Sequence, residues 1–304
     1  GGLPLGVAGV AIAYQRHMEI SQQVRVGVDP EHPGALAVLN GQASDWTKDP
    51  VPGPLAVTSE WASLSSIKCA DDVTARIDSE NSSCRRLPSA ADGALRVVAA
   101  GDSHVAQNTI PTLRLLHESR DWDITVYLKG ACSFGPPEYS KDRCREHNEA
   151  VLEQIEKNPP DVVVLQTTET SDDSSVELLR PGIRRLVEQL TDQGITVIGF
   201  RDNPRSDQSL YECANAVGPR TLVGGCLFPQ AGAMAVEDPA KSLEEIPLFH
   251  QIDASDMLCP DGVCGTIIGD VFVYMDDNHV SATYSRTMAP ELASRVERVM
   301  GIEE

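Results

Sequence analysis

The chain has 304 residues, of which 41% are hydrophobic, 23% charged and only 5% aromatic. This length suits one large globular domain or two small ones, with ample chain for a buried core. The formal net charge of −20 repels phosphate backbones and anionic lipid headgroups, and the few aromatic residues argue against a base-stacking surface, so nucleic acid is excluded as a partner.

The sequence opens with GGLPLGVAGVAIAYQRH, whose apolar run is shorter than the ~20 residues that span a bilayer and lacks the basic start of a signal peptide. We interpret it as the tail of a membrane segment that has been removed, or as a short helix within a helical stretch near residues 7–25. The turn-rich stretches DPEHPG and DPVPGP follow. Residues 1–60 are therefore expected to form a linker or extension, and residues 61–304 a domain with its core at 94–304.

The eight cysteines form neither a Cys-x-x-Cys motif nor a Cys/His cluster with zinc-finger spacing, so no metal site is expected. Their number is even, and neighbours in sequence fall into short-range pairs. Disulfides of this kind are typical of an oxidising compartment, whereas a cytosolic protein would keep eight reduced thiols. Of the 105 possible pairings, we expect Cys69–Cys84, Cys132–Cys144, Cys213–Cys226 and Cys259–Cys264.

From residue 94 onward, short apolar runs alternate with helical patterns. Strands are expected at residues 95–101, 124–130, 161–168, 194–200 and 250–258, and an edge strand at 271–275. Helices are expected after the first strand and near residues 141–157, 175–193, 207–217, 232–246 and 281–300. Near-continuous apolar strands between helices predict an α/β fold, a three-layer αβα sandwich around a central, mainly parallel five-stranded sheet. Ligands of such folds bind beyond the carboxyl ends of the strands.

The first strand is followed directly by Gly101, Asp102, Ser103 and His104. One interpretation is a helix cap, because Asp and Ser are favoured there. The other is a serine nucleophile at a helix N-terminus, where its own backbone N–H helps to hold an oxyanion.

A base for this serine is available near the C-terminus, in the stretch MDDNHV. Asp276 and His279 are three residues apart, so one loop can bring both to the same face. His279 would take the proton of Ser103, and Asp276 would orient the imidazole. The alternative is a polar turn with a cap at Asn278.

The combination of GDSH after the first strand and DDNH before the last helix resembles the SGNH/GDSL hydrolase superfamily over about residues 94–304. The chain is most similar to the extracytoplasmic SGNH domain fused to bacterial acyltransferase-3 membrane proteins. That group has a cysteine-bearing segment before GDSH and a Cys-Pro-Asp-Gly bridge before the last motif. CPDGVC at 259–264 and RDNPR at 201–205 match this pattern.

The resemblance implies a catalytic triad of Ser103, His279 and Asp276. It also implies an oxyanion hole made by the Ser103 amide, by Gly130, with the Cys132 amide as a competitor, and by a third donor. Thr168 stands where the superfamily has asparagine, and Gln166 or Thr167 are the alternatives for that third donor. His104, Gln166 and Arg201 are the candidate substrate-binding residues.

The resemblance further implies an acyl-Ser103 intermediate, expected to be acetyl, whose acyl group passes to a hydroxyl of a carbohydrate or glycolipid. The acyltransferase-3 membrane domain of the same polypeptide would supply the acyl group. The SGNH domain would lie on the extracytoplasmic side, tethered to the membrane by that domain. No metal or organic cofactor is implied. The alternatives are a secreted carbohydrate acetyl-esterase and a non-catalytic glycan-binding module. We interpret the acidic run at 171–177 as a solvated loop rather than a calcium site.

Overall fold

A seven-stranded sheet forms the centre of the protein, as seen in a computed structural model that describes residues 31–41, 48–64, 66–69, 82–170, 177–217 and 226–302. The strand order is β1-β2-β4-β3-β5-β8-β10. The strands are β1 (Ile67–Lys68), β2 (Ser82–Leu87), β3 (Arg96–Gly101), β4 (Asp123–Lys129), β5 (Val162–Gln166), β8 (Thr196–Phe200) and β10 (Phe249–Ile252).

The five expected parallel strands are confirmed, since β4, β3, β5, β8 and β10 pair in parallel. The sheet is wider than expected because β2 and β1 extend it as antiparallel strands beyond β4. Their sequence is mostly polar: in β2 only Cys84 is buried, so periodicity gave no sign of a strand.

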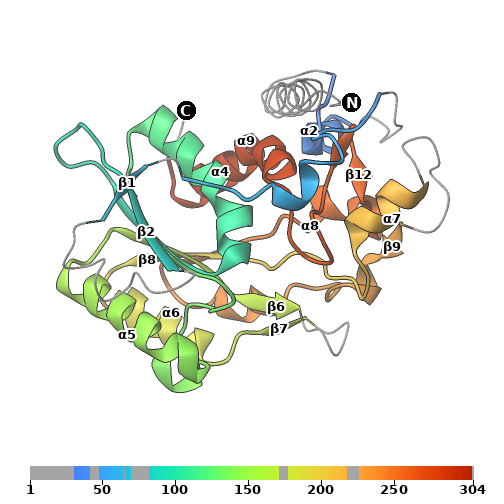
Figure 1. The fold of residues 1–304 in the computed structure, drawn as a ribbon. Coiled ribbons are helices and arrows are strands. Elements are labelled where there is room, and N and C mark those ends of the chain that lie inside the picture. The colour runs from blue at the N-terminus through green and yellow to red at the C-terminus, as the bar shows by residue number, and fades with distance from the viewer. Residues whose placement is uncertain are drawn as a thin grey trace, which may run out of the picture.

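Two helical layers cover the sheet (Figure 1). The helices α4 (Ser103–Arg120) and α9 (Ala282–Val299) lie on one face, and α5 (Asp142–Lys157) and α6 (Ile183–Thr191) lie on the other. Strand β5 has every residue buried: Val162 and Val164 pack with α4 and α9, while Val163 and Leu165 pack with α5 and α6. Burial on both faces explains the run of consecutive valines. The three-layer αβα sandwich is thus confirmed.

Several expected elements are shorter than the sequence indicates. The helix expected at 175–193 begins only at Ile183, because residues before Pro181 and Gly182 form β7 (Glu177–Leu179), which pairs with β6 (Thr168–Thr170). The strand expected at 250–258 ends at Ile252 and gives way to α8 (Ser255–Leu258). The helix expected at 207–217 is α7 (Leu210–Val217).

Two expectations for the C-terminal half of the chain are wrong. The helix expected at 232–246 is replaced by the 3₁₀ turns η3 (Gln230–Gly232) and η4 (Pro239–Leu243), since Pro239 lacks the N–H that a longer helix needs. The stretch 271–275 joins no edge of the main sheet, because β13 (Val271–Phe272) forms a tight hairpin with β12 (Ile267–Ile268). The remaining short elements are α2 (Ala35–Leu39), η1 (Val57–Ser59), η2 (Pro137–Tyr139), η5 (Pro260–Gly262), β9 (Phe228–Pro229) and β11 (Val263–Cys264).

The described part of residues 31–60 packs on the C-terminal half of the domain. The Ala35 amide donates to Thr287 Oγ1 of α9 at 3.0 Å, and the Val51 amide donates to the Asp270 carbonyl at 3.0 Å. The helix expected near 7–25 lies outside the described residues. Among those described, no helix is long and apolar enough to cross a bilayer.

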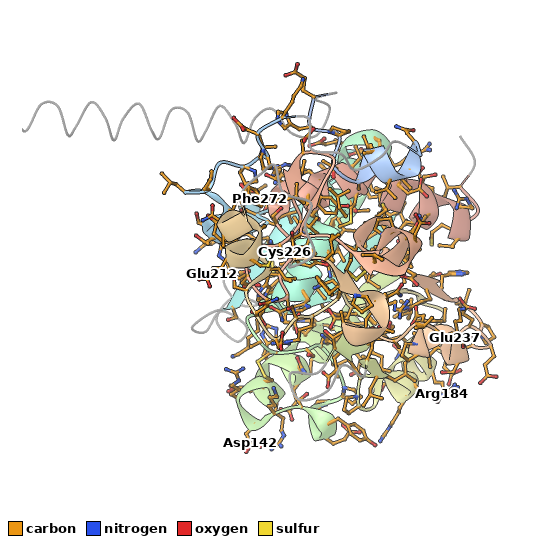
Figure 2. All side chains as sticks on the ribbon, turned by 90° about the vertical axis from the view of Figure 1, so that its right-hand side faces the viewer. Asp142, Arg184, Glu212, Cys226, Glu237 and Phe272 are labelled. Carbon is orange, nitrogen blue, oxygen red and sulfur yellow. A yellow bond between two sulfur atoms is a disulfide. The ribbon has the colours of Figure 1, made fainter. Side chains whose placement is uncertain are left out.

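All four expected disulfides are present: Cys69–Cys84, Cys132–Cys144, Cys213–Cys226 and Cys259–Cys264. Every cysteine of the chain is therefore paired. The acidic side chains Asp142, Glu212 and Glu237 are exposed on the surface, whereas Cys226 and Phe272 lie inside (Figure 2).

The turn from β3 into α4 has no room for a side chain at Gly101. A Cβ atom there would lie 2.2 Å from Val105 Cγ2, and the branched Val105 side chain is itself buried at 1% exposure. Gly101→Ala is expected to destabilise the domain by about 1–3 kcal/mol through overpacking. Urea unfolding of Gly101→Ala, Val105→Ala and the double variant measures this. The double variant should be more stable than the sum of the single effects. Additive effects would contradict the clash.

Candidate active site

Ser103 is the first residue of α4, directly beyond the carboxyl end of β3. Asp102 caps the helix: its Oδ1 accepts a hydrogen bond from the His104 amide at 3.0 Å. The two interpretations of GDSH are therefore compatible, because Asp102 provides the cap and leaves the Ser103 hydroxyl directed elsewhere. The helix N-terminus adds a partial positive charge beside this hydroxyl.

The Ser103 hydroxyl lies in line with His279 and Asp276. His279 Nε2 is 2.9 Å from Ser103 Oγ, and His279 Nδ1 is 2.7 Å from Asp276 Oδ2. When Nδ1 carries the proton and donates a hydrogen bond to the carboxylate, Nε2 is free to accept a hydrogen bond from the serine hydroxyl. The three residues expected from sequence are thus brought together with the geometry of a serine nucleophile and its base.

A tight turn between β13 and α9 fixes Asp276 and His279 relative to each other. Asp276 Oδ1 accepts from the backbone amides of Asn278 at 3.0 Å and His279 at 2.7 Å. Burial would raise the pKa of the Asp276 carboxyl, but the hydrogen bonds from the His279 ring and these two amides outweigh burial and lower it. The carboxylate therefore stays ionised, as the partner of an imidazolium must be.

A second histidine–aspartate pair lies beside the first. His104 Nδ1 is 2.6 Å from Asp202 Oδ1, its Nε2 is 3.0 Å from Asn278 Nδ2, and its ring centroid is 4.9 Å from that of His279. Burial would lower the pKa of His104, but the Asp202 carboxylate outweighs burial and raises it. Of the three candidate substrate-binding residues, His104 is the one that the structure brings to the Ser103 site.

Sequence reasoning missed Asp202. This residue stands two positions after the end of β8, as Ser103 stands two positions after the end of β3. Its carboxylate also accepts from the amide and hydroxyl of Thr170, at 2.8 and 3.0 Å. The rule that ligands bind beyond the strand ends would have singled it out.

A buried ion pair supports the start of α4 from the other side. Arg180 Nη2 is 3.3 Å from Asp102 Oδ2, which also accepts from the Ser133 hydroxyl at 3.1 Å. Burial would raise the pKa of Asp102, but Arg180, His104 and the hydrogen bonds of His104 and Ser133 outweigh burial and lower it to about 2. No spacing in the sequence links Arg180 to Asp102.

The strand register brings Gly130 to the same edge of the sheet as Ser103. Gly101 pairs with Leu128, so Ser103 and Gly130 each lie two residues beyond a matched pair. The competing amide of Cys132 already donates to the Lys129 carbonyl at 3.0 Å. Of these two amides, Gly130 therefore stays the candidate oxyanion donor.

Thr168 lies deeper than expected for the third oxyanion donor. It is fully buried, and its hydroxyl oxygen accepts from the Asp202 amide at 2.9 Å. Of the alternatives, Thr167 donates to the Gln251 amide oxygen at 3.0 Å, and the Gln166 side chain donates to the Thr168 carbonyl at 3.1 Å. These three side chains stabilise the chain between β5 and β6.

Arg201 and Gln166 are enclosed by protein and are not placed to meet a substrate. The Arg201 guanidinium pairs with Glu177 at 2.7 Å and with Asp253 at 2.8 Å, and its side chain is only 2% exposed. Gln166 is also 2% exposed. The expectation that they bind substrate is corrected here. Arg201 instead neutralises the buried carboxylate of Glu177, because a buried charge is stable only when it is paired.

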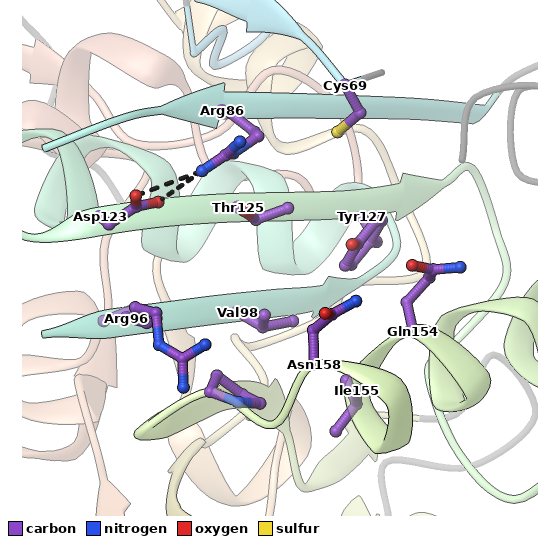
Figure 3. Close-up of a pocket in the computed structure, with 12 residues that line it drawn as sticks. Cys69, Arg86, Arg96, Val98, Asp123, Thr125, Tyr127, Gln154, Ile155 and Asn158 are labelled. Carbon is purple, nitrogen blue, oxygen red and sulfur yellow. Dashed lines mark hydrogen bonds and ion pairs between the residues drawn. The ribbon is translucent and has the colours of Figure 1, made fainter. Parts of the chain in front are cut away.

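Neither a metal cluster among the described residues nor a cavity under α5 adds to this site. No group of three or more His, Cys, Asp or Glu side chains fit to hold a metal occurs among the described residues, and most of the acidic run 171–177 lies outside them. A cavity of about 320 Å³ lies between α5 and the sheet, lined by Arg96 and Asp123, the first residues of their strands (Figure 3). It runs along the α5 side of β3 and β4 from these residues to Tyr127, and Figure 3 shows its Arg86 paired with Asp123.

An αβα sandwich with a serine, a histidine and an aspartate at the carboxyl edge of its sheet defines the SGNH class of proteins. The family described as "SGNH domain (fused to AT3 domains)" matches residues 68–294, and the chain belongs to this family. No curated protein matches the sequence significantly. A solved structure, the periplasmic domain of the Salmonella ser. Paratyphi A lipopolysaccharide acetyltransferase, is similar at 15% identity and a TM-score of 0.49, covering 68% of this chain and 85% of that one.

The buried Asp102 carboxyl makes the stability of the domain depend on pH. Its pKa is about 2 in the folded chain, against an ordinary value of 3.8. Because the folded value is the lower one, its stabilising contribution is complete above pH 3.8 and is lost as the pH falls towards 2. Unfolding free energies measured between pH 4 and pH 2 should fall by about 2 kcal/mol more in the wild type than in Asp102→Asn.

The matched control is Asp142→Asn, which removes a carboxyl whose side chain is 93% exposed. This variant should keep the slope of the wild type. Parallel curves for the wild type and Asp102→Asn would contradict the assignment.

Proposed function

We propose that this chain transfers an acyl group, expected to be acetyl, to a hydroxyl of a carbohydrate or glycolipid through an acyl-Ser103 intermediate. The observation that carries the proposal is the contact of Ser103 Oγ with His279 Nε2 at 2.9 Å, continued to Asp276 at 2.7 Å. Membership of a family fused to acyltransferase-3 domains supports acyl transfer as the reaction class.

In the first half-reaction, Ser103 Oγ attacks the carbonyl carbon of the acyl donor. Its proton moves to His279 Nε2, and the negative charge of Asp276 stabilises the imidazolium. The amides of Ser103 and Gly130 are the proposed donors to the oxyanion, and the N-terminus of α4 favours the developing negative charge. The donor's leaving group then takes the proton from His279, and the acyl ester of Ser103 remains.

In the second half-reaction, the hydroxyl of the acceptor attacks the acyl-Ser103 ester. His279 takes the hydroxyl proton and returns it to Ser103 Oγ as the ester bond to serine breaks. Water in place of the acceptor gives hydrolysis. In the absence of an acyl-donor domain, this SGNH domain is therefore expected to act as a weak acetyl-esterase.

The family and the cysteines support a proposal for the acyl donor and for the cellular location. We infer that an acyltransferase-3 membrane domain in the same polypeptide supplies the acyl group. The four disulfides support an oxidising, extracytoplasmic compartment, and tethering to the membrane is part of this proposal. An acidic surface does not hinder an uncharged sugar acceptor.

Hydrolysis of p-nitrophenyl acetate tests the triad. Ser103→Ala and His279→Ala should each lower kcat by roughly a thousandfold or more, because each removes a group that acts in the transition state. Asp276→Asn should also lose activity, since an amide cannot stabilise the imidazolium.

Asp277→Asn is the matched control for the aspartate. Asp277 is the next residue, is partly exposed, and pairs with Arg205 at 3.4 Å rather than with His279. It should keep a rate close to that of the wild type. Equal rates in the wild type and Ser103→Ala would overturn the proposal and favour a non-catalytic glycan-binding module.

A further inference from the structure

Trp61 exposes a large aromatic surface next to the base of the triad. Its ring centroid is 5.0 Å from that of His279, with the planes inclined at 66°, and 51% of the residue is exposed. The other described tryptophan, Trp122, is 4% exposed and packs in the core. Trp61 precedes the segment matched by the family, which begins at residue 68.

The backbone on either side of Trp61 is fixed by Gln107, a fully buried residue of α4. The Gln107 Oε1 accepts from the Ala62 amide at 2.5 Å, and its Nε2 donates to the Glu60 carbonyl at 3.0 Å. The same Nε2 donates to the Val280 carbonyl at 2.6 Å, next to His279. One amide side chain thus ties the segment carrying Trp61 to the loop carrying His279.

Glu60 fixes this segment a second time. Its carboxylate accepts from the Thr283 amide at 2.8 Å and from the Thr283 hydroxyl, and its carbonyl accepts from the Ala282 amide at 3.0 Å. Trp61 is therefore an apolar surface held in place on both sides. Such preorganisation lowers the entropic cost of binding a ligand.

We propose that Trp61 is the binding platform for the sugar ring whose hydroxyl exchanges the acyl group with Ser103. This inference rests on the proposed function. A pyranose has an apolar face of C–H groups and polar hydroxyls at its edge. The indole ring can cover the apolar face while the hydroxyls stay hydrated or turn towards His279.

The distances fit this arrangement. His279 separates the indole from the nucleophile, with 5.0 Å between the Trp61 and His279 ring centroids and 2.9 Å between His279 Nε2 and Ser103 Oγ. A sugar resting on Trp61 would therefore present an edge hydroxyl, or its acetyl ester, to the atoms that react. The platform selects rings over small aliphatic esters.

Binding is the first test, because it does not depend on turnover. In the Ser103→Ala background, mono-O-acetylated methyl glucosides and galactosides are titrated and followed by saturation-transfer NMR. Trp61→Ala should weaken binding about tenfold, the equivalent of about 1.4 kcal/mol, and Trp61→Phe should retain part of the affinity. Ile67→Ala, which truncates an apolar residue that is 62% exposed on the edge strand β1, is the control.

The second test separates binding from positioning of His279. With Ser103 intact, kcat/KM is measured for the acetylated glycosides and for ethyl acetate, which has no ring. Trp61→Ala should lower the ratio of the two values about tenfold. An unchanged ratio, or an unchanged affinity in the NMR titration, would overturn the platform. Hydrolysis that survives Ser103→Ala would instead overturn the proposed function, while the titration would still report on Trp61.

Discussion

The buried amide of Gln107 is the contact on which the geometry of the site depends. Ser103 and His279 are 176 positions apart in sequence, and Gln107 lies one helical turn after the serine. Its side chain bonds to the residues flanking Trp61 and to the carbonyl after His279. Its backbone carbonyl also accepts from the Ser285 hydroxyl of α9. One side chain with no exposed surface thereby connects the start of α4, the loop carrying His279 and the segment carrying Trp61. Both polar atoms of this buried amide have hydrogen-bond partners, as burial of a polar group requires.

Two histidine–aspartate pairs share this edge of the sheet, and their environments differ. The His279–Asp276 pair is partly exposed, with the side chains at 18% and 38%, and one nitrogen of His279 faces Ser103. The His104–Asp202 pair is more enclosed, at 11% and 3%, and Asp202 is held by further hydrogen bonds. Of these two pairs, His279–Asp276 is the one that hydrogen-bonds to the Ser103 hydroxyl. The second joins the start of α4 to the chain after β8 and stabilises the position of the first.

The sequence was sufficient for features that follow from local patterns. The runs of buried valine in β5 predicted a strand covered on both faces, and the close spacing of the cysteines predicted all four disulfides. The motifs GDSH and DDNH predicted the contact between Ser103 and His279. In each case the residues that determine the feature lie near one another in sequence, or belong to a motif.

Features that depend on contacts between distant residues could not be predicted in this way. The partners of Arg201 and Arg180 come from β7 and from the cap of α4, and neither pairing leaves a mark in the spacing. Strand β2 is polar because it lies near the sheet edge, so periodicity missed it. Trp61 likewise carries no mark in the sequence, because its contact with His279 and the hydrogen bonds of Gln107 to its neighbours join residues far apart in the chain.

Acylation of the serine tests the central claim most directly. The protein is mixed with p-nitrophenyl acetate, quenched in acid during turnover, and analysed by intact mass and peptide mapping. The account predicts a single acetyl group on the peptide that contains Ser103, and none on that peptide in Ser103→Ala. An acetyl group that maps to another residue, with hydrolysis unchanged when Ser103 is replaced, would contradict it.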